Sequence, residues 1–249
     1  MRTLLVASVF TIALPASGMY LDVTDTTRLI TVEKTSNARL NVRLHSAGLF
    51  AYSGRIVCNN PVADVNFTYE RKSWGYMFFK AEDLKDGRTD INFALTGFYT
   101  NIHVSKKLTV TPFVAFRMEQ TTKIADKGSD AIFIVTTAYR FHHDWILDNS
   151  SLLSNIMLEK KDMDWINRFR LLYSHKHIDA GLMVWNNTKV LNNDHYVSGG
   201  MNIAYSRIKL SDHLLMSAGM TGIVMMTTSD TSEFPKTNGV VFTLAATLH

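Results

Sequence analysis

His103 and Ser105 are the residues whose types and spacing could best support catalysis. On a β-strand, two side chains separated by one residue lie on the same face, so the imidazole could take a proton from the hydroxyl. A hydroxyl activated in this way is the nucleophile of acyl-transfer reactions. The chemistry would take place beside a short connection, because Lys106 and Lys107 follow the pair directly.

The nine histidines are unevenly distributed. Imidazoles gathered at one end of a fold could bind a transition metal, or change charge between about pH 5 and 8. Histidine also suits an interface where one end of the ring is wet. Because the spacing is not that of a defined metal site, we predict neither a metal nor a cofactor. The histidines in or beside short connections are His103, His142, His143, His175, His177, His213 and His249.

Composition excludes several classes of protein. The 249 residues are 46% hydrophobic and 19% charged, which excludes a disordered chain. The single cysteine, Cys58, excludes an internal disulfide framework and an all-cysteine metal site. The net charge is only +4 and no basic run exceeds two residues, so we predict no nucleic-acid partner.

The N-terminal residues are typical of an export signal. Arg2 precedes an apolar run of about ten residues, and Ala16, Ser17 and Gly18 form a small-residue exit. We expect residues 1–18 to be a signal peptide. Residues 19–37 are polar enough to be a periplasmic segment, or partly a further strand.

The dominant hydrophobic period after residue 38 is two, which indicates β-strands. Apolar residues alternate with others in many segments, clearly so at 64–70, 108–119 and 240–248. In 108–119, Val114, Phe116 and Met118 share one face. Residues 39–58 keep one phase, so they could form one long strand or a hairpin that turns near Ser46.

The connections between these strands alternate in length. Short ones lie near 105–107, 142–144, 174–176 and 209–212, and longer polar ones lie at 82–89, 120–128, 159–163, 187–194 and 229–237. Tight turns at one end and long loops at the other are typical of a transmembrane β-barrel. Counting back from the C-terminal strand gives about twelve strands, the even number that such barrels have.

This pattern resembles the bacterial outer-membrane β-barrel proteins over nearly all of residues 38–249. Such proteins commonly end on an aromatic residue, whereas here Leu248 is penultimate and His249 is last. The resemblance implies an all-β, closed antiparallel transmembrane barrel with short periplasmic turns, longer extracellular loops and a location in the bacterial outer membrane. Some outer-membrane lipid hydrolases also have a His and a Ser separated by one residue. Their substrate is outer-leaflet lipid, whereas His103 and Ser105 lie beside a short turn, at the periplasmic end of the predicted barrel. We therefore predict no catalytic residue and no enzyme.

In this architecture one face of each predicted strand contacts lipid and the other faces the lumen of the barrel. Only a closed barrel satisfies the backbone in lipid, so the apolar face must point outward and the polar face into the lumen. Charges in the lumen could form ion pairs that hold it together, or could attract anionic solutes. The predicted lumen-lining residues are Asp64, Glu70, Arg117, Glu119, Asp130, Arg140, Arg168, Arg170, His177 and Asp179.

The function that we expect is passive or weakly selective passage of small polar solutes through this charged lumen. The expected partners are outer-membrane lipid and such solutes, and the oligomeric state stays open. A twelve-strand barrel is narrow enough for inward side chains to close it. Alternatives are a non-conducting structural or adhesion barrel that presents its loops to a partner, and a lipid-modifying enzyme.

Overall fold

The computed structural model describes residues 37–50, 54–85, 91–119, 130–157, 163–231, 234 and 237–248. The regular elements in these ranges are strands. Within them no helix is long and apolar enough to cross a membrane. The strands are β1 (Asn37–His45), β2 (Gly48–Phe50), β3 (Arg55–Cys58), β4 (Val62–Arg71), β5 (Trp74–Asp83), β6 (Asn92–Thr100), β7 (Ile102–His103), β8 (Leu108–Glu119), β9 (Asp130–His142), β10 (Trp145–Ser154), β11 (Asp164–His175), β12 (Ile178–Lys189), β13 (His195–Lys209), β14 (Leu214–Thr228) and β15 (Gly239–Leu248).

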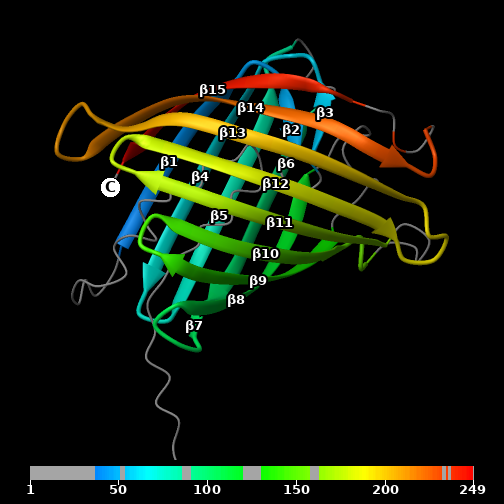
Figure 1. The fold of residues 1–249 in the computed structure, drawn as a ribbon, viewed down its shortest axis with the longest axis horizontal. Coiled ribbons are helices and arrows are strands. Elements are labelled where there is room, and N and C mark those ends of the chain that lie inside the picture. Colours follow the sequence, from blue (N-terminus) through cyan, green and yellow to red (C-terminus); the bar gives the residue numbers. More distant parts are fainter. Residues whose placement is uncertain are drawn as a thin grey trace, which may run out of the picture.

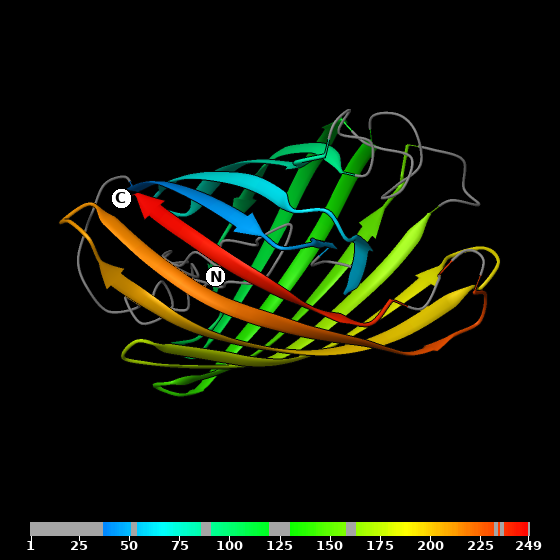
Figure 2. The ribbon, with the colours of Figure 1, turned by 90° about the horizontal axis from the view of Figure 1, so that it is seen from above.

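Twelve of these strands form one closed antiparallel barrel, as the sequence predicted. Neighbours in the chain pair from β4 to β15, apart from the short β7, which pairs with the start of β8 while β6 pairs directly with β8 (Figure 1). The barrel closes where β1 pairs with β15, with Leu40 opposite Leu248 and Leu44 opposite Leu244. Figure 2 shows these two strands, blue and red, side by side. Closure pairs the two edge strands of the wall sheet with each other, so the backbone groups at these edges are hydrogen-bonded, as a lipid environment requires.

Exposure alternates along the wall strands with the predicted phase. On β15, Val240, Phe242 and Leu244 are exposed while Val241 and Thr243 are buried. Strand β8 has the same alternation, with Val114 and Phe116 exposed. A continuous apolar exterior of this kind is stable only against hydrocarbon. The architecture is that of the bacterial outer-membrane barrels, and it agrees with the predicted location.

The two rims differ in the way that the loop lengths predicted. One rim holds the tight turns at 72–73, 143–144, 176–177 and 210–213, together with the start of β1 and the end of β15. The other rim holds the longer connections. In barrels of this kind the short turns are periplasmic and the long loops extracellular.

The region 39–58 forms neither a single long strand nor a hairpin of the wall. The chain leaves the wall after His45, where the Ser46 backbone N–H donates to the Phe242 carbonyl (2.9 Å). Strands β2 and β3 then pair only with each other. The apolar period has a different origin in its two parts. On β1 its apolar residues Val42 and Leu44 face outward, whereas Ile56 of β3 is buried against the inner face of other strands.

The barrel interior is divided into two sectors. Inward side chains on β5–β9 form most of an apolar core, which extends to Ile146 and Leu152 of β10 and to Ile166 and Leu172 of β11, whereas the inner face of β1 and of β12–β15 carries many buried polar side chains. A polar lumen throughout was expected from the sequence. Tyr99 lies on the boundary of the two sectors: its ring is buried and its hydroxyl donates to Glu70 (2.8 Å), because β6 presents its odd-numbered residues inward. The apolar sector includes Met77, Phe79, Phe93, Leu95, Phe113, Ile132 and Ile134.

The predicted signal peptide, residues 1–18, and the predicted N-terminal segment up to residue 36 lie outside the described residues. The barrel wall begins at Asn37.

Candidate functional site: the inner face of the barrel

A four-residue network joins β1, β4 and β15 inside the barrel. The Nε of Arg43 donates to Oδ1 of Asp64 (2.7 Å), and Nε2 of His45 lies 2.8 Å from Oδ2 of the same carboxylate. Nδ1 of His45 is 2.8 Å from the Thr243 hydroxyl. Arg43 and Asp64 are opposite each other in register, so the strand pairing itself brings the opposite charges together. Both are almost completely inaccessible, which makes their mutual neutralisation necessary.

A second charged group lies on the adjoining strands β10 and β11. Arg170 donates from Nε to Oδ1 of Asp148 (2.7 Å) and from Nη2 to Oδ2, a two-bond arrangement that suits the planar guanidinium. Two residues earlier on β11, Nη2 of Arg168 donates to the hydroxyl of Ser150 (3.1 Å). Each arginine is opposite its acceptor in register. Arg168 and Arg170 therefore present two buried cations in succession along the inner face.

The β2–β3 hairpin packs against the wall beside these arginines. Leu49 and Ile56 from the hairpin share one buried cluster with Met183 and Trp185 of β12, and also with Ile223 and Val241. Trp185 is opposite Arg168 in the β11–β12 register. The hairpin and the Trp185 ring together therefore narrow the lumen next to the two arginines.

Arg55 and Gly54 hold the hairpin in place. The Arg55 guanidinium lies over the rings of Tyr196 (5.5 Å) and Phe234 (5.6 Å), within the range of cation–π attraction. Gly54 has a φ of 61°, and a Cβ there would lie 2.4 Å from Cδ2 of Trp185. Only glycine meets both conditions, the left-handed backbone and the close approach to the indole.

Three other predicted lumen residues, Arg117, Asp130 and Asp179, also have buried side chains that engage charged or polar partners inside. Arg117 contacts Asp130 (3.9 Å) and donates to Asn155 (3.2 Å). Asp130 in turn accepts the backbone N–H groups of Asn155 and Met157, which fixes the residues directly after β10 to the start of β9.

At the short-turn end, Asp179 accepts hydrogen bonds from the Ser174 hydroxyl (2.6 Å) and from Arg207 (3.1 Å). Glu70 accepts the Tyr99 hydroxyl on the boundary of the apolar sector.

Two predicted residues differ in placement from this group, and the side chain of a third is not described. His177 lies in the exposed turn between β11 and β12, where its ring packs against Tyr205 on the outer face (5.4 Å between centroids). Arg140 lies at the short-turn rim and donates to the His143 carbonyl (3.2 Å). Glu119 ends β8, and its side chain lies outside the described part of the structure.

Four inward residues were not predicted from the sequence: Arg43, Asp148, Ser150 and Trp185. Arg43 could have been found from phase, because it alternates with the outward residues Val42 and Leu44. Asp148 and Ser150 gave no such signal, because both faces of β10 mix polar and apolar residues.

His103 and Ser105 engage separate partners at the short-turn rim. Nδ1 of His103 is 3.0 Å from the Thr109 hydroxyl, and the Ser105 hydroxyl accepts the backbone N–H groups of Lys107 and Leu108. The serine therefore stabilises the turn.

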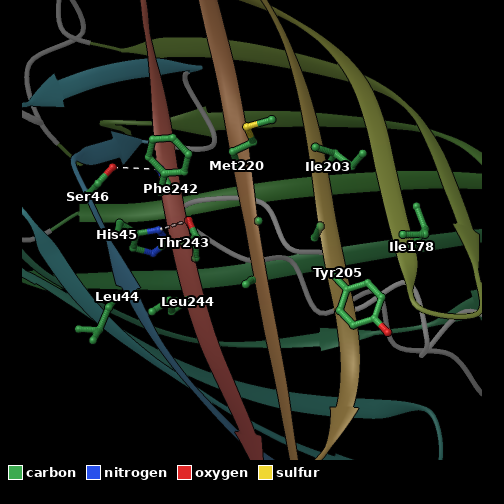
Figure 3. A pocket seen from close by; sticks show the side chains of 13 residues that line it. Leu44, His45, Ser46, Ile178, Ile203, Tyr205, Met220, Phe242, Thr243 and Leu244 are labelled. Atoms are coloured by element: carbon green, nitrogen blue, oxygen red, sulfur yellow. Dashed lines mark hydrogen bonds between the residues drawn. The ribbon is translucent and has the colours of Figure 1, made fainter.

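A groove of about 660 Å³ runs over β12–β15 and β1 on the outer face (Figure 3). Small residues on β14, Ala218 and Gly219, leave space between larger neighbours, and His45 is hydrogen-bonded to Thr243 behind the groove. Its apolar lining would contact acyl chains in a membrane, which separates it from the polar inner face. The side chains that border it include Leu44, Ile178, Ile203, Met220, Phe242 and Leu244.

Solved structures with the same fold are outer-membrane porins. A KdgM porin has a TM-score of 0.57 over 85% of this chain and 98% of its own, with 6% sequence identity. A NanC porin has a TM-score of 0.54 over 84% of this chain and 99% of its own, with 9% identity. A KdgM porin in complex with disordered oligogalacturonate has a TM-score of 0.53 over 86% and 98%, with 6% identity. No protein-family profile and no curated protein sequence matches the chain. The chain thus has the fold of an outer-membrane porin barrel.

Proposed function

We propose that this protein is a porin-like channel for small polar solutes, with a preference for anionic ones. The observation that carries the proposal is the pair of successive buried arginines, Arg168 and Arg170, beside the narrowing formed by β2–β3 and Trp185. Positive charge at the narrowest part of a pore raises the local concentration of anions and lowers the barrier to their entry.

Two further observations support an anionic solute. The described inner face carries the buried cations Arg39, Arg43 and Arg117 in addition to the two arginines of β11, although Arg43 and Arg117 lie beside the carboxylates of Asp64 and Asp130. One structure with the same fold is a porin in complex with oligogalacturonate, a chain of carboxylated sugars. An arginine fork suits carboxylates because it offers two parallel donors.

Reconstitution into planar lipid bilayers tests the proposal. The refolded chain is expected to produce discrete conductance steps. In a salt gradient, the sign of the reversal potential is expected to show that anions permeate more readily than cations. A reversal potential at zero or of the opposite sign would remove the preference for anions, and absence of steps would remove the channel.

The near-complete inaccessibility of Arg43, Arg168 and Trp185 favours one second candidate, a non-conducting barrel that presents its long loops to a partner. Inward side chains that fill a twelve-strand barrel would block ions. In that case the bilayer recordings show no conductance steps, although the protein migrates as a folded barrel on gels of unboiled samples.

A further inference from the structure

Three metal-ligating side chains meet at the short-turn rim, outside the lumen. His142 ends β9, and His143 and Asp144 form the turn before β10. Nε2 of His142 lies 3.1 Å from Nδ1 of His143, and Nε2 of His143 lies 2.9 Å from Oδ2 of Asp144. One ligand atom from each residue can be chosen so that all three lie within 4.8 Å of one another.

A fourth residue reaches this cluster from the next hairpin. Nδ1 of His175, at the end of β11, lies 3.3 Å from Oδ2 of Asp144. The Ser174 backbone N–H donates to the Asp144 carbonyl (2.9 Å), which fixes the end of β11 against the turn. Arg140 donates to the His143 carbonyl and restrains the turn from the other side. The spacing along the chain did not predict this cluster, because His175 belongs to a different hairpin.

We propose that His142, His143 and Asp144 bind a divalent transition-metal ion, with Zn²⁺ as the best fit. Zinc binds imidazole nitrogen at about 2.0–2.1 Å, so neighbouring ligands of a tetrahedral ion are about 3.3 Å apart. The 3.1 Å between Nε2 of His142 and Nδ1 of His143 is close to this spacing, and one ligand atom from each of the three residues lies within 4.8 Å of the other two. Two imidazoles and one carboxylate favour Zn²⁺ over Ca²⁺ or Mg²⁺, which prefer all-oxygen sites.

His175 is the positioning residue of the proposed site. Carboxylates that ligate metals are themselves held by hydrogen bonds, and His175 supplies this contact to Asp144. The side chains of His142 and His143 are exposed, so an ion can reach them directly from solvent, and one coordination position is left for water. Asp144 belongs to the β9–β10 turn and contacts His175 of β11, so an ion bound to Asp144 would also strengthen the link between the turn and β11.

The test is zinc binding by the untagged chain, refolded in detergent and equilibrated with buffered Zn²⁺. We expect one retained ion per chain by elemental analysis, and Co²⁺ in its place is expected to give the visible absorption of a four- or five-coordinate ion. The variants H142A/H143A and D144N are expected to weaken binding at least tenfold. The matched control is H213A, because His213 is an exposed histidine beside an aspartate on the same rim but outside the cluster.

Two outcomes would overturn the proposal. One is retention of zinc by the wild type at no more than the level of H142A/H143A, and the other is an equal loss of affinity in H213A. The substituted residues lie at the end of β9 and in the turn after it, where both histidines are exposed and Asp144 is partly buried. Heat-dependent gel mobility verifies that each variant is folded. Because the readout is metal content, the result does not depend on whether the barrel conducts.

Discussion

Arg170 on β11 donates two hydrogen bonds to the carboxylate of Asp148, which lies directly opposite it on β10. Both side chains are buried inside the barrel. The pair therefore links neighbouring strands on the inner face while it places a cation next to the β2–β3 hairpin.

Removal of one partner of this pair should destabilise the barrel. Asp148→Ala leaves the Arg170 charge buried without its carboxylate, at an expected cost of about 3–5 kcal/mol in free energy of unfolding. The double variant Asp148→Ala/Arg170→Met should recover most of that loss, because it removes the uncompensated charge. Urea titration of the refolded protein measures both. Equal stability of the single and double variants would contradict this role.

Removal of the two arginines of β11 should change ion selectivity. Arg168→Ser/Arg170→Ser removes two cations and leaves the Asp148 carboxylate, so the permeability ratio of anions to cations is expected to fall severalfold. The matched control is Lys106→Ser/Lys107→Ser, which removes the same charge from an exposed turn. Reversal potentials in a salt gradient measure the ratio, and a shift in the control alone would locate selectivity at the rim.

Displacement of the β2–β3 hairpin should widen the lumen. In Gly54→Ala the new Cβ would lie 2.4 Å from the Trp185 ring and the backbone φ is positive, so the hairpin must move. We expect larger single-channel conductance and a loss of about 1–3 kcal/mol in stability. Gly222→Ala is the control, because a Cβ at that position meets nothing within 4 Å. Unchanged conductance in Gly54→Ala would exclude the hairpin as the constriction.

A charge on the exposed apolar face should oppose membrane folding. Leu244→Arg places a cation on the outer face of β15, at an expected cost of about 2–4 kcal/mol for a position near the bilayer midplane. Leu244 is 54% exposed, so little of this cost would come from lost packing inside the protein. Folding into lipid vesicles, followed by the heat-dependent gel shift across a urea series, measures it. Ser211→Arg in the β13–β14 turn should fold like the wild type.

The alternation of residue types along the chain determined the fold of this protein and the outward face of its strands. A period of two, together with connections of alternating length, was enough to predict the closed barrel, its twelve strands and the outward face of Val114, Phe242 and Leu244. The physical reason is local, because side chains on a strand alternate between two solvents and a shift of one residue would reverse every one of them. Arg168 and Arg170 were identified by the same phase.

Only the tertiary structure decided what the side chains meet across the barrel. The period was identical through β1 and β2–β3, so it could not show that the chain leaves the wall after His45 and packs Ile56 near Trp185. Nor could it show the contact of Asp144 with His175, which depends on the register of β10 with β11. The phase of the alternation assigns each residue to one face of its strand. Its neighbours are set by the register of strand pairing and by where the chain turns, and both depend on contacts between segments far apart in the chain.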